Sequence, residues 1–199
     1  MKKIVLSLLT IITFIACEKK DGAEGANVHI TGNVEGLGQG KLYIQKIQDS
    51  ALVILDSIII KGDSKFESNI KLESPEMLYL FLDRGQTNSI DNNLMFFAEP
   101  GNIKIETTLK EFFAGAKISG SKSHDLWVEF NKINRRFNED NLTLIEKRLK
   151  NELKPNQATS DSIETAYQNL LKRKYRYTAN FAVNHSDNSI APYLALSEI

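Results

Sequence analysis

Hydrophobic and polar residues alternate along much of the chain between residues 27 and 120, with the period of two that a half-buried strand requires. The segment "VHITGNV" places Val28, Ile30 and Val34 on one side, and "FESNIKL" repeats the pattern after the turn "KGDSK". Further strands are indicated by "KLYIQKI", "LVILDSIII", "EMLYLFLD", "NLMFFAEPGN", "IKIETTL" and "AKISG". About eight strands at this spacing predict an antiparallel β-sandwich or open barrel over residues 27–120.

After Gly120 the apolar period lengthens to that of a helix. We expect a first helix with Ser121 or Ser123 as its N-cap, a second helix that ends before Pro155, and a third that opens with a capping box at Asp161. Their apolar faces would consist of Leu126, Phe130, Ile133 and Phe137, then of Leu142, Ile145 and Leu149, then of Ile163, Tyr167, Leu170 or Leu171, Tyr177 and Phe181. The predicted fold class is therefore mainly β, then α.

A last helical segment is expected after Ser189, which we interpret as its cap, with Pro192 tolerated in the first turn. The sequence ends within the first turns of this expected helix and shows no C-terminal cap. We therefore expect residues 121–199 to form a helical segment of three to four helices that is truncated.

The amino terminus has a different pattern. Two lysines follow Met1, and an apolar run then extends from Ile4 to Ala16, which is typical of a secretory signal peptide over residues 1–16. The run is shorter than the about 20 apolar residues of a membrane-spanning helix. The segment "FIAC" resembles the lipobox of bacterial lipoproteins. That resemblance implies cleavage before Cys17, a diacylglyceryl group on its sulfur and an acyl chain such as palmitate on the new amino terminus. An ordinary secretory signal and an uncleaved anchor remain as alternatives.

Residues 17–26 contain the lipidated cysteine and a polar stretch with glycine and alanine, which predicts a flexible tether. In the lipoproteins that this leader resembles, an aspartate directly after the cysteine marks retention in the inner membrane, and here the residue is Glu18. We therefore expect a cell-envelope protein held by membrane lipid through Cys17, in the outer membrane, with its periplasmic or surface face undecided.

Composition narrows the function classes. The chain is 42% hydrophobic and 25% charged, as folded globular proteins are. Its 25 basic and 25 acidic residues cancel, and removal of the leader with its two lysines leaves a net charge of −2. A protein so close to neutral lacks the basic surface that nucleic-acid binding needs, so we expect no nucleic-acid partner. A single cysteine also excludes a disulfide framework within the chain.

Candidate chemical groups do not form a recognisable active site. His29, His124 and His185 share no ligand spacing, so we expect no metal. A triad of Ser123, His124 and Asp125 is disfavoured because adjacent helical residues do not face one another. The carboxylates near strand ends fit turn chemistry better than acid–base catalysis: Asp56, Asp83, Asp91 and Glu99. The turn "GLGQG" is followed by a strand, which excludes a dinucleotide fingerprint. We expect no enzyme and no cofactor.

Two further patterns concern modification and docking. Ser50, Ser57 and Ser162 lie in Asp-Ser-apolar tripeptides that resemble an O-glycosylation signal of exported proteins in some Gram-negative bacteria. The basic, aromatic stretches "LKRKYRY" and "NRRF" would suit anionic lipid or an acidic partner, although nearby acids favour an ordinary solvated helix face.

The order of several motifs carries a resemblance over residues 28–133. "ITGNVEGLGQGKLYIQKI", "ILDSIIIKGDSKFESNIKLESPEMLYL", "FFAEPGNIKIE" and "ISGSKSHDLWVEFNK" are similar to an uncharacterised N-terminal β-domain, a domain of unknown function, of Gram-negative lipoproteins. In that family the domain and a helical linker usually precede a thioredoxin-like module related to thiol–disulfide interchange proteins and peroxiredoxins. The resemblance implies such a module as a partner in cis or in trans. Its redox activity has no cysteine to act through in this chain.

The sequence thus predicts a lipid-anchored envelope protein that acts as a non-catalytic binding or spacer module for an unknown ligand. The alternative is the N-terminal, non-catalytic part of a membrane-anchored thiol–disulfide oxidoreductase whose catalytic module is absent here. A third interpretation is a surface adhesin or glycan-capture lipoprotein.

Overall fold

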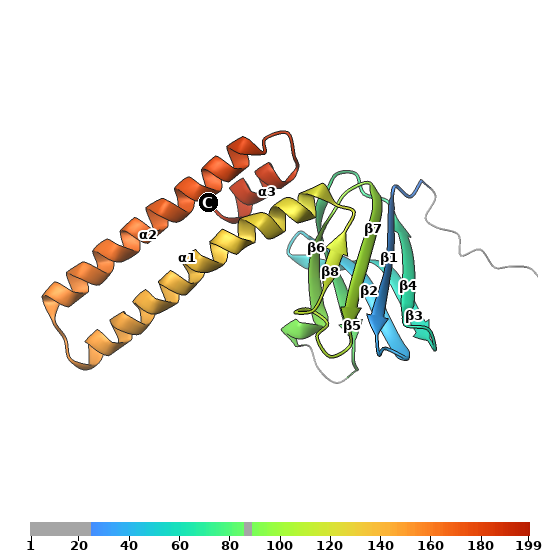
Figure 1. Cartoon of the computed structure of the whole chain (residues 1–199), viewed down its shortest axis with the longest axis horizontal. Helices are drawn as coiled ribbons and strands as arrows, with labels where there is room; N and C mark the ends of the chain where they lie inside the picture. Colours follow the sequence, from blue (N-terminus) through green and yellow to red (C-terminus); the bar gives the residue numbers. More distant parts are fainter. Residues whose placement is uncertain (1–24, 86–88) are drawn as a thin grey trace, which may run out of the picture.

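The computed structural model describes residues 25–85 and 89–199. Over these residues the chain forms eight strands in two sheets, followed by three helices (Figure 1). The strands are β1 (Val28–Glu35), β2 (Gln39–Gln48), β3 (Ala51–Lys61), β4 (Lys65–Ile70), β5 (Glu76–Asp83), β6 (Asn93–Ala98), β7 (Gly101–Thr108) and β8 (Lys117–Ser119). The predicted fold class is confirmed, with a sandwich rather than a closed barrel.

Each sheet has four strands. Sheet A has the order β4-β1-β7-β8, and sheet B has the order β3-β2-β5-β6. The pairs are antiparallel except for β1 and β7, which run parallel with Val28 opposite Gly101. A short 3-10 helix, Ile90–Asn92, precedes β6.

The main core lies between the two sheets and follows from the alternating pattern. In β1, Val28, Ile30, Gly32 and Val34 are buried, while the alternate residues His29, Thr31 and Asn33 are partly exposed. Leu42 and Ile44 of β2 face them from sheet B. The strands therefore bury one apolar face each, which is the arrangement that drives two sheets together.

The helices are α1 (Lys122–Leu153), α2 (Gln157–Asn184) and α3 (Ile190–Ser197). Figure 1 shows α1 and α2 as a long antiparallel hairpin that extends away from the sandwich, with α3 tucked near its base. A second apolar cluster joins this base to the outer face of sheet B and contains Met77, Phe97, Phe130, Phe181, Ile190 and Leu194. No helix among the described residues is long and apolar enough to cross a bilayer.

The prediction of two separate helices between Ser121 and Pro155 is wrong. Residues 122–153 form one continuous helix of 32 residues. The segment "NEDN" (138–141) contains neither proline nor glycine, so nothing forces a break. Two contacts with α2 support the helix at this segment. Asp140 pairs with Arg173 at 3.3 Å, and the Phe137 ring lies 5.9 Å from the Tyr177 ring.

One predicted cap, Asp161, is also wrong, whereas Ser189 stands at the predicted cap position of α3 without a side-chain cap bond. The helix α2 begins at Gln157 rather than at Asp161, because the side chain of Asn156 accepts a hydrogen bond from the backbone N–H of Thr159 at 2.9 Å. At α3, Ser189 makes no side-chain cap bond, and the oxygen of Asn188 accepts from the backbone N–H of Ile190 instead. In both cases an asparagine side chain makes the cap bond that we assigned to a later residue.

Candidate functional site

The junction between the sandwich and the helices is built around the first turn of α1. The side chain of Ser121 caps the helix by accepting from the backbone N–H of His124 at 3.0 Å, which confirms Ser121 as one of the two predicted caps. The carboxylate of Glu99, at the end of β6, accepts from the backbone N–H of Lys122 and from the hydroxyl of Ser123, each at 2.5 Å. A negative charge at the positive end of a helix is favourable, so Glu99 ties the two parts of the fold together.

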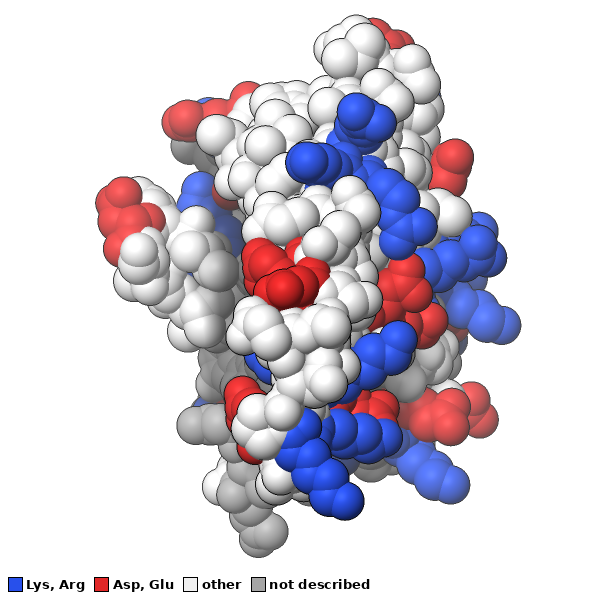
Figure 2. All heavy atoms as spheres, turned by 90° about the vertical axis from the view of Figure 1, so that its left-hand side faces the viewer, with Lys and Arg blue, Asp and Glu red and all other residues white. Residues whose placement is uncertain are grey.

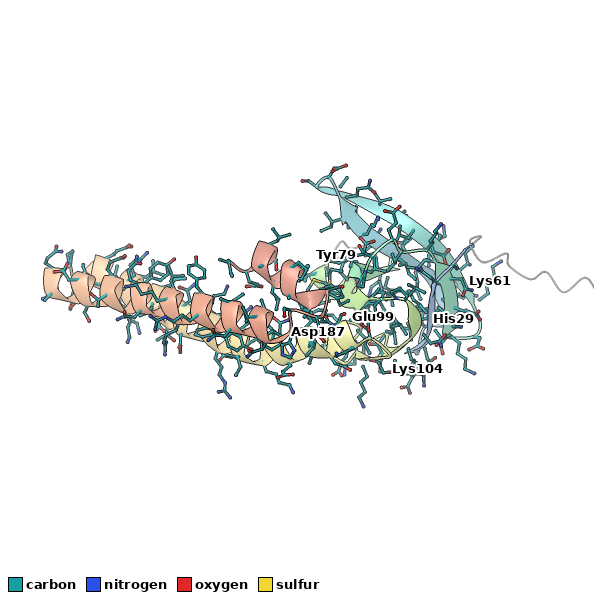
Figure 3. All side chains as sticks on the ribbon, turned by 90° about the horizontal axis from the view of Figure 1, so that it is seen from above. His29, Lys61, Tyr79, Glu99, Lys104 and Asp187 are labelled. Carbon is teal, nitrogen blue, oxygen red and sulfur yellow. The ribbon has the colours of Figure 1, made fainter. Side chains whose placement is uncertain are left out.

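The loop before α3 reaches the same junction. The Ser123 hydroxyl also lies 3.1 Å from the side-chain oxygen of Asn188, and it donates its one proton to either this oxygen or Glu99. Lys122 and Asp187 form a long, exposed ion pair at 3.9 Å, which contributes little to stability. Figure 3 shows Glu99 and Asp187 close together where the helices meet the sandwich.

His124 is buried in this junction. Its Nδ1 accepts a hydrogen bond from the backbone N–H of Phe97 at 3.3 Å, so this nitrogen is unprotonated. Burial lowers the pKa of His124 below its ordinary value, and the nearby charge of Asp125 partly opposes that shift. The indole ring of Trp127 lies 5.6 Å from the imidazole. His124 is therefore a neutral acceptor that holds a strand end to a helix.

These contacts show whether Ser123 and His124 form a nucleophile–base pair. The hydroxyl of Ser123 is directed to Glu99 and Asn188, whereas the imidazole of His124 is directed to the backbone of β6. A nucleophile–base pair requires the hydroxyl and the imidazole to share a hydrogen bond. The two side chains point to different partners, as expected for neighbours on a helix.

A second candidate site is the end of the β2–β3 hairpin. Four consecutive apolar residues of β3, Ala51–Ile54, are exposed to solvent. Opposite them on β2, Ile47 is 54% exposed and pairs with Leu52, which is 58% exposed. We call Ile47 together with residues 51–54 the apolar ribbon. Runs of exposed apolar residues of this length are rare in monomeric proteins unless they have a function.

The apolar ribbon continues onto the outer face of sheet B. The helices cover the half of that face formed by β5 and β6 near Met77 and Phe97. The other half carries the stacked rings of Tyr43 and Phe81, whose centroids are 6.2 Å apart, and the exposed Ile59. Figure 3 shows the hairpin of β2 and β3 sweeping away from the rest of the sandwich beside Tyr79.

The outer face of sheet A has the opposite character. Its exposed or half-exposed side chains are polar and contact one another. His29 lies 2.6 Å from the side-chain oxygen of Asn69 and 3.8 Å from Glu67, and Lys104 pairs with Glu106 at 2.9 Å. Only sheet B therefore presents an apolar outer surface.

The structure places the predicted modification sites in three different settings. Ser50 lies in the β2–β3 turn, Ser57 lies in β3 and Ser162 lies in α2, and all three are exposed. Cys17, the predicted lipidation site, lies outside the described residues. So do the predicted signal peptide and most of the tether.

The candidate carboxylates and histidines do not gather into one site. Asp56 accepts from the backbone N–H of Ser57 at 2.7 Å and from the hydroxyl of Ser68. Asp83 accepts from the backbone N–H of Gly85 at 2.9 Å, and Glu99 is engaged at α1. Within residues 25–85 and 89–199, no group of three or more His, Cys, Asp or Glu side chains could hold a metal ion.

Sequence reasoning missed both sites. The segment "LVILDSIII" predicted a strand, but its pattern does not indicate which of its residues are exposed to solvent. A run of four apolar residues without alternation is typical of a strand that is buried on both faces, so the sequence offered no signal that this run is exposed. The role of Glu99 had no local signal, because its partner Lys122 is 23 residues away in the chain.

Figure 2 shows the side of the molecule on which the tip of the helical hairpin faces the viewer. Basic and acidic side chains are interspersed across it. Several of them are paired, including Lys150 with Glu146, Arg148 with Glu164 and Arg173 with Asp140. This face therefore has no single-sign patch like those that attract nucleic acid.

Comparisons with known proteins extend this description. No curated protein shows a significant match to the sequence. Two crystal structures of transthyretin from the sea bream Sparus aurata, one with thyroxine bound, match with TM-scores of 0.33 and 0.35 at 10% sequence identity. Each match covers 48% of this chain and 99% or 97% of the transthyretin chain. Similarity at this level carries no information on function.

The sequence profile of one family matches residues 28–127, which is half of the 199-residue chain. The match runs from the first residue of β1 into the first two turns of α1. It includes Glu99, Ser121, Ser123 and His124, and it also includes the apolar ribbon. The chain belongs to the family of the domain of unknown function DUF4369.

Proposed function

We propose that this protein is a lipid-anchored cell-envelope protein that acts as a non-catalytic binding and spacer module. The observation that carries the binding role is the apolar ribbon, where four consecutive residues of β3 are exposed. Exposed apolar patches of this kind mark interaction sites on soluble domains. The spacer role is supported by the helical hairpin, since a helix of 32 residues is about 48 Å long.

The anchoring role is supported by the sequence. An apolar run that ends at Ala16 precedes the one cysteine of the chain, Cys17, in a lipobox-like context. In Figure 1 the described chain starts on the side of the sandwich away from the helical hairpin. A tether attached there would hold the sandwich at the membrane and direct the hairpin away from it. We assign the anchor to the outer membrane.

The mass of the mature protein tests the anchor. We expect a chain that begins at Cys17 and carries a diacylglyceryl group and an acyl chain, and we expect Cys17→Ser to move the protein from the membrane fraction to the soluble fraction. An unmodified chain that begins at another residue would contradict the proposal. Added hexose in the same spectrum would support glycosylation at Ser50, Ser57 or Ser162.

Site-specific photo-crosslinking in intact cells tests the binding role. A photoreactive amino acid at Leu52 should give a discrete crosslinked species. The same amino acid at Lys104, on the polar outer face of sheet A, is the matched control and should give none. Equal and diffuse crosslinking from both positions would contradict a binding role for the apolar ribbon.

A second candidate function is that of the N-terminal, non-catalytic part of a membrane-anchored thiol–disulfide oxidoreductase. It is favoured by exposed apolar side chains in the last residues of the sequence. Leu196 of α3 is 89% exposed and Ile199 is 60% exposed. A thioredoxin-like module, in cis or in trans, could cover them, as the sequence resemblance implies. Reading the coding sequence beyond Ile199 tests the cis form: a continuing frame with a Cys-x-x-Cys motif would support it, and a stop codon would exclude it.

A further inference from the structure

The two sheets have four edges, and three of them carry features that prevent edge-to-edge pairing. In sheet A, β8 has only three residues, and β4 places the exposed charges of Lys65 and Glu67 along its length. In sheet B, β6 contacts α1. Short strands, charged side chains and covering helices are the devices by which proteins protect sheet edges.

The fourth edge, β3, lacks these features between Ala51 and Ile54, before the bulge at Leu55. Residues 51–55 carry no charge and no proline, and all but Leu55 are exposed. The partner strand extends beyond the rest of the sheet here, because β5 pairs with β2 only as far as Lys46. The end of the hairpin is therefore a two-stranded ribbon with solvent on both faces. Such a ribbon is at most marginally stable by itself.

We propose that this edge pairs antiparallel with β3 of a second copy of the chain, about a two-fold axis. An antiparallel pairing of two identical edges is self-complementary, since each strand offers the other the same free N–H and C=O groups. Because residues 51–55 are uncharged, the pairing brings no like charges together. Sheet B then continues from one copy into the other.

The apolar side chains of the ribbon become covered in this arrangement. Ile47, Leu52 and Ile54 lie on the outer face of sheet B, as their cross-strand pairing shows, and Val53 lies on the inner face opposite Lys46. Leu52 and Ile54 on the outer face and Val53 on the inner face would meet β3 side chains of the second copy across the new pair of strands, and Ile47 would lie beside them on β2. Cross-strand apolar contacts of this kind stabilise sheets.

The size of the interface sets the expected strength. The four large side chains are between 37% and 58% exposed, so each copy covers roughly 200 Å² of apolar side-chain surface. A standard interface buries about 800 Å² per partner. Backbone pairing between the two β3 edges supplies part of the difference. We therefore expect a weak dimer with a dissociation constant in the micromolar range.

A lipid surface is a poorer occupant of the ribbon. The turn at its end consists of Asp49 and Ser50. Insertion of the tip would take the Asp49 carboxylate into the bilayer first, which is costly. A peptide of another protein could also pair with the edge, and the experiment below separates that outcome.

Cysteine crosslinking of the full chain in cells provides the test. Cys17 is the one native cysteine, so single cysteines placed in turn at Ala51, Leu52, Val53 and Ile54 report on the β3 edge with little background. We expect at least one of them to give a disulfide-linked species of twice the monomer mass on mild oxidation. A cysteine at Ser162, which is exposed on α2, is the matched control and should stay monomeric.

Sedimentation of the purified Cys17→Ser chain gives the independent measurement. We expect the average mass to rise toward that of a dimer between about 1 and 200 µM, in the concentration range of a standard weak complex. Ile54→Lys should shift the dissociation constant at least about tenfold, because it places a charge from each copy within the paired apolar strands. Lys104→Ala, on the outer face of sheet A, should leave the dissociation constant unchanged.

The dimer deepens the binding role proposed above, and the two can fail separately. A monomer up to about 200 µM together with no disulfide from any of the four positions would overturn the dimer. If Leu52 then still crosslinks to a species of another mass in cells, the binding role stands with a different partner. If neither measurement detects a partner, both proposals fail.

Discussion

The imidazole of His124 accepts a hydrogen bond from the backbone N–H of Phe97, at 3.3 Å, across the junction between α1 and β6. Glu99, two residues after Phe97, accepts a hydrogen bond from the backbone N–H of Lys122, the first residue of α1. The end of β6 thus holds the start of α1 at two points. The apolar cluster that contains Phe97 and Phe130 lies beside these contacts and also joins α1 to the outer face of sheet B.

We predict that the folded protein loses stability in mild acid because of His124. Burial lowers the pKa of His124 below its ordinary value of 6.5, so the unfolded chain binds a proton more readily than the folded chain. The contribution is therefore complete above about pH 6.5 and is lost as the pH falls through the lowered folded-state pKa. Urea unfolding midpoints between pH 8 and pH 5 measure this loss.

His124→Asn provides the control for the pH effect. Its side-chain oxygen can accept from Phe97 in place of Nδ1 and does not titrate in this range. We expect His124→Asn to reduce the loss of stability between pH 8 and pH 5. Asp125→Asn should make the decrease steeper, because the Asp125 charge opposes the shift. An unchanged slope in His124→Asn would show that another group is responsible.

We predict that Glu99→Ala lowers the free energy of unfolding by about 1–3 kcal/mol, because it leaves the first N–H of α1 and the Ser123 hydroxyl without their acceptor. Glu99→Gln should lose less, since it keeps one oxygen. Glu106→Ala removes a carboxylate from an exposed pair with Lys104 and serves as the control. Chemical denaturation that gives equal losses for Glu99→Ala and Glu106→Ala would contradict the role of Glu99.

We predict that Gly120→Ala is strongly destabilising, by about 3 kcal/mol or more. Gly120 has a φ of 93°, and a Cβ at this position would lie 2.0 Å from the backbone oxygen of Asn102. Gly38→Ala is the control, because a Cβ at Gly38 has nothing within 4 Å. Thermal unfolding should show a large loss for Gly120→Ala and a change within about 0.5 kcal/mol for Gly38→Ala.

We predict that Ser50→Gly stabilises the protein by about 0.5–1 kcal/mol. Asp49 and Ser50 have φ values of 49° and 69°, the left-handed pair that a two-residue hairpin turn requires and that glycine adopts without steric cost. The same substitution in a helix, Ser162→Gly, should instead destabilise by about 0.5 kcal/mol. Urea unfolding of both variants checks the opposite signs.

Much of the fold could be predicted from local patterns. The alternation in "VHITGNV" corresponds to the alternating burial of β1, and the turn "KGDSK" separates β3 from β4. The change of period after Gly120 located the helical part, and Ser121 was among the predicted caps. These features are local, since a strand or helix pattern extends over a few neighbouring residues.

Other features depended on partners that are distant in the sequence. The predicted apolar face of Leu142, Ile145 and Leu149 exists on α1, but all three side chains are at least 43% exposed. The start of α2 was misplaced because Asn156 and Asp161 are both plausible N-caps, and residue type alone does not choose between them.

The sequence by itself determined the strands, the change from strands to helices after Gly120 and the apolar leader that ends at Ala16, because each follows from the spacing of residues along the chain. Only the tertiary structure decided that Glu99 holds α1, that His124 is a buried acceptor and that β3 is an uncovered edge. Burial and pairing depend on which surfaces meet. A run such as "LVILDSIII" has the same pattern whether a neighbouring strand covers it or solvent does.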